Sequence, residues 1–236
     1  MWIYWWSYII VVPGILLSIF AQTLVSSAYN RYSKIKAKSG WTADTLSQKL
    51  LSDNGCYVRV APIRGNLTDN YNPSTKVLSL SQSTYGQSGI AALGVAAHEV
   101  GHAVQDAENY FPLRLRSFIV PVVNFGSRLA IPLLLLGIFL EFFIQTPTFG
   151  DLFITLAIVS YSLATVFSLI TLPVEFNASR RAIRMLEESG ALDKEELSGA
   201  KKVLTAAAMT YVASMLTSLL YLLRFILIAS RFRRRN

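Results

Sequence analysis

The chain has 236 residues, of which 53% are hydrophobic and only 15% are charged, and its formal net charge is +8. A soluble globular domain carries about 25% charged residues, so the composition excludes a disordered chain and argues against an ordinary soluble enzyme. The basic residues lie mostly beside apolar runs, where cations meet anionic lipid headgroups, so the charge indicates a lipid bilayer and no nucleic-acid partner. The single cysteine, Cys56, excludes an intramolecular disulfide and a cysteine-rich metal site.

The first apolar stretch, Trp2–Tyr29, contains no charged residue and is long enough to cross a bilayer. A basic cluster follows it: Arg31, Lys34, Lys36 and Lys38. The positive-inside rule then places the N-terminus outside and makes residues 1–30 a transmembrane anchor. Its outer aromatic belt would be Trp2, Tyr4, Trp5 and Trp6. The alternative, a cleaved signal peptide that ends near Ser26–Ala28, lacks the positive segment with which such peptides begin.

Three further apolar stretches follow. Two of them, Phe118–Ile144 and Leu152–Leu172, predict a pair of transmembrane helices within residues 118–172, although the first contains Arg128 and Glu141. The last, Val203–Ala229, precedes a tail of four arginines within residues 203–236. Counting spans puts this tail outside, whereas the positive-inside rule puts it inside. The expected number of spans is therefore three or four, since the Ala- and Thr-rich first half of the last stretch could pack on the water-facing lobe.

Residues 31–117 predict a water-facing lobe on the cytoplasmic side, because the segment from Arg31 to Arg116 holds ten basic and six acidic residues. Its patterns predict, in chain order, a helix, a strand, a turn-rich segment, a short strand and an apolar helix: Thr42–Leu51, Cys56–Pro62, Leu67–Thr75, Lys76–Ser81 and Ser88–Ala107. Residues 173–202 predict two more cytoplasmic helices: Glu175–Glu188, which begins just after Pro173, and one from Asp193 that may extend into the last apolar stretch. The expected fold is a predominantly helical α+β membrane protein with a short β-sheet in its cytoplasmic lobe.

The motif His98-Glu-Val-Gly-His102 lies within the apolar helix and contains the only two histidines of the chain. The spacing of four residues puts both imidazoles on one helix face, where they can share a Zn²⁺ ion. Glu99 lies beside them, where it can take a proton from the attacking water. The alternative is a pair of buried structural histidines with an ion-paired glutamate.

A catalytic zinc site usually has three protein ligands, so a carboxylate should complete the site. The downstream cytoplasmic carboxylates are Asp106, Glu108, Glu175, Glu187 and Glu188. Asp106 and Glu108 follow the motif too closely on the same helix to turn back to the metal. Glu175 begins a predicted helix directly after an apolar stretch and is favoured, although an acid there would also stabilise the helix dipole.

Three strings resemble one family in the same order over nearly the whole chain: Ala-Ala-His98-Glu-Val-Gly-His102-Ala-Val-Gln, Glu175-Phe-Asn-Ala-Ser-Arg-Arg-Ala182 and Thr210-Tyr-Val-Ala213. They resemble the neutral zinc metallopeptidases of bacterial membranes, the YugP-like proteins, which are similar in turn to the HtpX and CAAX-endopeptidase gluzincins. The resemblance implies a membrane-anchored zincin-like endopeptidase with one zinc per chain, held by His98, His102 and Glu175. HtpX-like enzymes commonly have an Asp four residues after the Glu ligand; here Ser179 stands there, with Asn177 nearby, so the histidines must be supported differently.

Two further predictions concern the reaction, namely the oxyanion donor and a strand that binds the substrate. Tyr211 is favoured as the oxyanion donor, with Arg180 or Arg181 as alternatives, because no histidine remains for this role. Tyr211 could equally be an interfacial anchor, and the two arginines a solvated pair that faces the lipid. Residues Val77, Leu78 and Ser79 could belong to an exposed edge strand that pairs with an extended substrate, or to an ordinary core strand.

The predicted function is therefore a zinc endopeptidase of the bacterial cytoplasmic membrane, active on the cytoplasmic face. Cleavage of membrane or membrane-proximal proteins is a substrate class implied by the resemblance alone, and nothing in the sequence supports or excludes a homo-oligomer. The alternative is a membrane scaffold or partner-binding protein whose zinc site only stabilises the fold. A small transporter would need ionisable residues that face each other across spans, and the apolar stretches offer only Arg128, Glu141 and Arg224.

Overall fold

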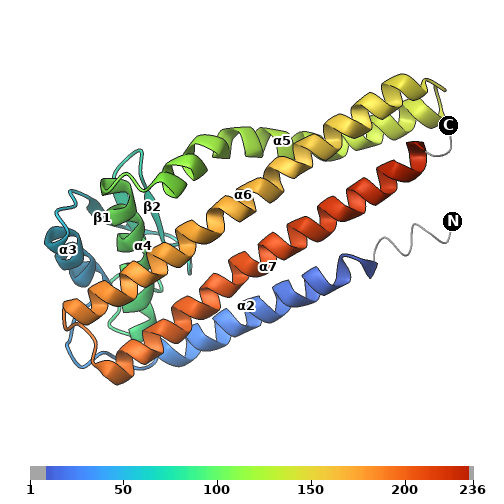
Figure 1. Cartoon of the computed structure of the whole chain (residues 1–236). Helices are drawn as coiled ribbons and strands as arrows, with labels where there is room; N and C mark the ends of the chain where they lie inside the picture. Colours follow the sequence, from blue (N-terminus) through green and yellow to red (C-terminus); the bar gives the residue numbers. More distant parts are fainter. Residues whose placement is uncertain (1–8, 234–236) are drawn as a thin grey trace. The chain divides into compact units, whose positions relative to one another are not determined.

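The computed structural model describes residues 9–233, in which six helices accompany one small sheet (Figure 1). The helices are α2 (Val12–Tyr32), α3 (Ala43–Asp53), α4 (Ile90–Ala107), α5 (Phe111–Phe142), α6 (Pro147–Glu188) and α7 (Lys194–Arg233). The strands are β1 (Arg59–Ile63), β2 (Asn70–Asn72) and β3 (Val77–Ser81). The predicted aromatic belt of Trp2, Tyr4, Trp5 and Trp6 lies outside the described residues.

The chain divides into two compact units. One, called here the helical unit, combines residues up to Phe20 with Leu115–Thr171 and the residues from Tyr211 onward. The other, called here the mixed unit, combines Ala21–Arg114 with Leu172–Thr210. Both the motif helix α4 and Glu175 belong to the mixed unit, although 73 residues separate His102 from Glu175 in the chain.

The mixed unit contains a three-stranded sheet in the order β1-β3-β2. Strand β3 pairs parallel with β1 and antiparallel with β2, so Leu78 lies between Val60 and Tyr71. The prediction that Val77–Ser79 forms an exposed edge strand is wrong, because these residues pair with β1 on one side and with β2 on the other. Strand β3 therefore has no free edge there for a substrate. Strand β2 was expected to be a turn, since asparagine is rare in strands; pairing with β3 outweighs that preference.

Two helices cover this sheet and build the core of the mixed unit. Leu46 and Leu50 of α3 are buried with Leu93 of α4 against Leu78 and Leu80 of β3, and each is at most 1% exposed. Helix α3 begins after Thr42 as expected, and the backbone N–H of Thr42 donates to the Thr45 hydroxyl at 3.2 Å. The core therefore holds α4, the helix that carries the histidines, in a rigid setting.

Helix α6 is one continuous helix, which corrects the prediction of a separate helix beginning after Pro173. Proline removes one backbone N–H donor, but such a gap is tolerated within long apolar helices, where neighbouring groups compensate. Helix α7 is also continuous from Lys194 into the last apolar stretch. It begins with a reciprocal cap, in which Asp193 accepts from the backbone of Glu196 and Glu196 accepts from the backbone of Asp193, both at 2.9 Å.

Four helices, α2, α5, α6 and α7, are long and apolar enough to cross a membrane, so all four expected stretches are candidate spans, and the crossing of the last one stays a prediction. The helical unit consists of parts of these helices and exposes large apolar side chains such as Phe118, Phe125 and Phe143, at 78, 69 and 74%. So much exposed apolar surface is unfavourable in water and is typical of a surface covered by lipid.

Candidate metal centre

The motif helix approaches α6 closely at Gly101, between the two histidines. A Cβ atom at this position would lie 2.7 Å from the backbone oxygen of Ala178, so only glycine permits this distance between the helices. Four residues separate His98 from His102, and both imidazoles therefore lie on the face of α4 that meets α6. Glu175 is on α6 three residues before Ala178 and reaches the same space.

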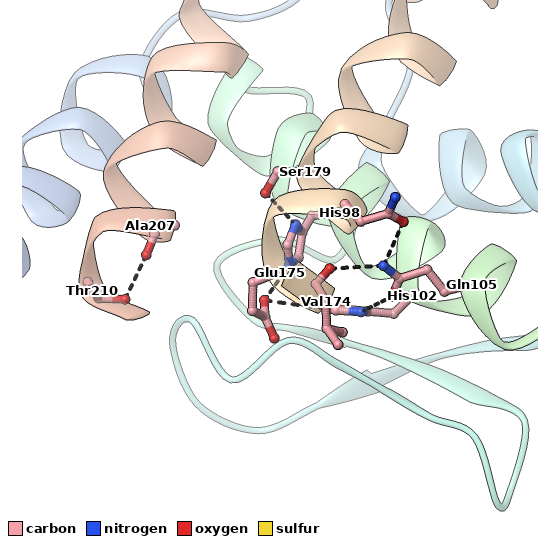
Figure 2. A network of polar contacts seen from close by, with 9 residues as sticks. His98, His102, Gln105, Val174, Glu175, Ser179, Ala207 and Thr210 are labelled. Atoms are coloured by element: carbon pink, nitrogen blue, oxygen red, sulfur yellow. Dashed lines mark hydrogen bonds and ion pairs between the residues drawn. The ribbon is translucent and has the colours of Figure 1, made fainter. Parts of the chain in front are cut away.

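The three predicted ligands converge on one point (Figure 2). Glu175 Oε2 lies 3.2 Å from His98 Nε2 and 3.5 Å from His102 Nε2, and the Glu175 side chain is 2% exposed. The candidate ligand atoms of the three residues all lie within 4.8 Å of one another. Two imidazole nitrogens and one carboxylate form the donor set of a catalytic zinc that keeps an open position, so these residues fit a Zn²⁺ ion.

A buried amide fixes the orientation of His102. Gln105, which is fully buried, has its Nε2 2.9 Å from the carbonyl oxygen of Val174. A carbonyl oxygen only accepts, so the amide nitrogen must face Val174 and the amide oxygen Oε1 must face His102 Nδ1, at 3.0 Å. His102 then carries a proton on Nδ1, which leaves the lone pair of Nε2 free for a metal.

The support of His102 extends to the surface through three further side chains. Asn177 Oδ1 accepts from Gln105 Nε2 at 2.9 Å and from Arg181 Nε at 2.7 Å. Arg181 also donates from Nη2 to Glu108 at 2.6 Å, and this hydrogen bond holds the pKa of the Glu108 carboxyl below its ordinary value. Arg181 therefore belongs to a chain of contacts that ends at His102.

The other histidine, His98, is oriented by a single side chain on the Nδ1 side of its ring. His98 Nδ1 lies 3.2 Å from the hydroxyl of Ser179 (Figure 2). A hydroxyl oxygen accepts from an Nδ1–H and so favours the same ring orientation, with Nε2 toward Glu175. Neither Gln105 nor this role of Ser179 was predicted from the sequence. A polar residue three positions after His102, on the buried face of α4, was the available signal for Gln105.

Glu99 is also buried, at 9% exposure, yet within residues 9–233 it makes no hydrogen bond and no ion pair. Neither carboxylate oxygen of Glu99 is fully enclosed, so the unpaired carboxylate reaches solvent beside the histidines, as a general base that takes a proton from water must. Its charge acts on His102: burial opposes protonation of that imidazole, but the hydrogen bond with Glu175 and the charge of Glu99 together raise the pKa of His102.

The structure leaves three other predicted roles untested. Tyr211 belongs to the helical unit, as the first residue of its last segment, so its distance from the metal centre is not defined and its oxyanion role stays a prediction. Arg180 is exposed and, with Arg181 and Arg184, lines a cavity of about 370 Å³ beside Asn177. The guanidinium of Arg181 already donates hydrogen bonds to Asn177 and Glu108. Of the two predicted arginines, Arg180 therefore has more donors available for a substrate.

Comparison with known proteins assigns the chain to a family. The family model described as putative neutral zinc metallopeptidase matches residues 7–230, so the chain belongs to that family, as the resemblance predicted. A curated relative, named putative membrane protease YugP from Bacillus subtilis (strain 168), is 48% identical over 214 residues, which cover 90% of this chain and 91% of the relative. No solved structure shows a significant match. With four candidate spans, these matches support a membrane protein with a protease role.

Proposed function

We propose that the protein is a membrane-embedded zinc endopeptidase that hydrolyses peptide bonds of membrane or membrane-proximal proteins, with Glu99 as the general base. The observation that carries this proposal is the combination of three converging ligands with Glu99 beside them, whose carboxylate reaches solvent and makes no hydrogen bond within residues 9–233. The family and the relative's printed name support the reaction class. The basic residues that follow α2 support an active site on the cytoplasmic face.

The chain supplies binding, orientation and proton transfer. His98, His102 and Glu175 would hold the zinc, which when bound supplies Lewis acidity to the scissile carbonyl and the attacking water. Gln105 and Ser179 keep both imidazoles turned so that Nε2 faces the metal. Glu99 takes the proton of the attacking water and passes it to the leaving amine.

Glu99→Gln tests this assignment, because the amide keeps the size of the side chain but cannot take a proton. The variant should retain the zinc content and melting temperature of the wild type, while hydrolysis of quenched fluorescent peptides in detergent falls at least about a hundredfold. Glu187→Gln, the same change at an exposed position, is the matched control and should keep full turnover.

Two outcomes would overturn the proposal. Full hydrolysis by Glu99→Gln would remove Glu99 as the base. A wild type that holds zinc but cleaves no peptide, even from a broad library or a membrane-tethered reporter, would favour the alternative of a scaffold with a structural zinc site.

A further inference from the structure

The mixed unit has a second concave site, a groove between α2 and α7 that shares no lining residue with the metal centre. Its volume is about 530 Å³, and its walls come from the last turns of α2 and the first turns of α7. The two helices run in opposite directions, so the apolar parts of both continue away from the same end of the groove.

Three cations gather at the other end of the groove. Arg31 comes from the last turn of α2, and Lys201 and Lys202 come from α7. All three side chains are exposed, and no carboxylate in the described part of the chain pairs with any of them. The guanidinium of Arg31 instead lies 5.6 Å from the ring centroid of Tyr32. The groove therefore presents three positive charges that no acid of the described chain neutralises.

The lining becomes less polar toward the candidate spans. Going back along α2 from Arg31, it passes Ala28 and reaches Leu24, a rise of about 10 Å along the helix. Going forward along α7 from Lys202, it passes Thr205 and reaches Ala206. The groove thus combines a cationic end with an apolar end over a length similar to the boundary between lipid headgroups and acyl chains.

Hydroxyl groups lie along the groove between these two ends. Ser27 of α2 and Thr205 of α7 line it there, with Ser198 beyond the cations, and hydroxyls donate hydrogen bonds to phosphate oxygens. An occupant that matches all three features carries a negative charge, several acceptor oxygens and an apolar chain.

We propose that this groove binds an anionic membrane phospholipid, with its phosphate at Arg31, Lys201 and Lys202 and the start of an acyl chain along Leu24 and Ala206. The charge complementarity selects an anionic headgroup over a zwitterionic one. The apolar end selects a lipid over a free phosphate ester. The proposal concerns a site separate from the metal centre and does not rest on the proposed peptidase function.

The test compares two lipids of equal chain length on the full chain purified in a nonionic detergent. Phosphatidylglycerol should bind at least about tenfold more tightly than phosphatidylcholine, as measured by native mass spectrometry or by the shift in melting temperature. The double variant Lys201→Ser/Lys202→Ser should weaken phosphatidylglycerol binding about thirtyfold. Arg31→Ser, on the other helix, should give a smaller loss in the same direction.

The matched control is Lys34→Ser/Lys36→Ser, which removes the same charge from exposed positions just after α2 but outside the groove. This variant should bind phosphatidylglycerol like the wild type, and all variants should elute from size exclusion as the wild type does. Equal binding of the two lipids, or equal losses in both double variants, would overturn the proposal. So would competition by glycerol 3-phosphate at concentrations similar to the lipid, since the acyl chain would then contribute nothing.

Discussion

At the scale of single residues, the histidines could be predicted from spacing, because four residues of helix bring two side chains to one face. Glu175 required elimination among distant carboxylates, and the structure brings it to 3.2 Å from His98. Gln105 was not predicted, because its role depends on Val174 and Asn177, which belong to another helix. The residue pattern of α4 alone does not show which groups of the neighbouring helix face it.

The role of Gln105 can be tested by Gln105→Leu, which removes the acceptor of the His102 Nδ1 proton. We expect zinc affinity, measured by competition with a chelator of known affinity, to fall about 10- to 100-fold. The loss of the Gln105 donor to the acceptor oxygens of Val174 and Asn177 should also cost about 1–3 kcal/mol of stability. Gln82→Leu, the same change at an exposed position, should alter neither quantity. Unchanged zinc affinity in a folded Gln105→Leu would show that His102 needs no such support.

At the scale of elements, long apolar patterns predicted the helices, and alternating patterns predicted two of the three strands, β1 and β3. The apolar helix within Ser88–Ala107 is present as α4, and the strand at Lys76–Ser81 is present as β3. The partners of β3 were not predictable, because the pairing of strands depends on contacts between distant segments. The break expected at Pro173 was wrong for a related reason, since a helix supported by its neighbours tolerates a missing donor.

The contact between α4 and α6 predicts that Gly101→Ala disrupts the metal centre without touching a ligand. The added methyl group would meet the backbone oxygen of Ala178, which cannot rotate away, so the helices must separate. We expect a loss of about 1–3 kcal/mol in stability and weaker zinc retention after a chelator wash. In Gly94→Ala, on the same helix, the added methyl group would come no closer than 3.4 Å to Ala200, so this variant should retain both the stability and the zinc. Equal behaviour of the two variants would mean that close helix approach does not position Glu175.

At the scale of the whole molecule, composition and apolar runs were enough to predict a membrane protein with a small mixed lobe. The four candidate spans support a membrane protein. The side of the membrane on which each end of the chain lies stays a prediction. An even number of spans puts both ends of the chain on the same side of the membrane. The basic residues after α2 favour the cytoplasm and so place the N-terminus outside, whereas the arginines that end the chain favour the cytoplasm for the C-terminus. The sequence pattern of each apolar stretch indicates whether that stretch can span, but not on which side of the membrane its ends lie, so it could not resolve this conflict.

The central claim is that one zinc ion is held by His98, His102 and Glu175. The most direct test is the metal content of the full chain purified in detergent, for the wild type and for Glu175→Ala side by side. We predict about one zinc per chain in the wild type and far less in the variant, with helix content preserved in both. A well-folded wild type that binds no zinc when supplied with it, or a Glu175→Ala variant that retains it fully, would contradict the account.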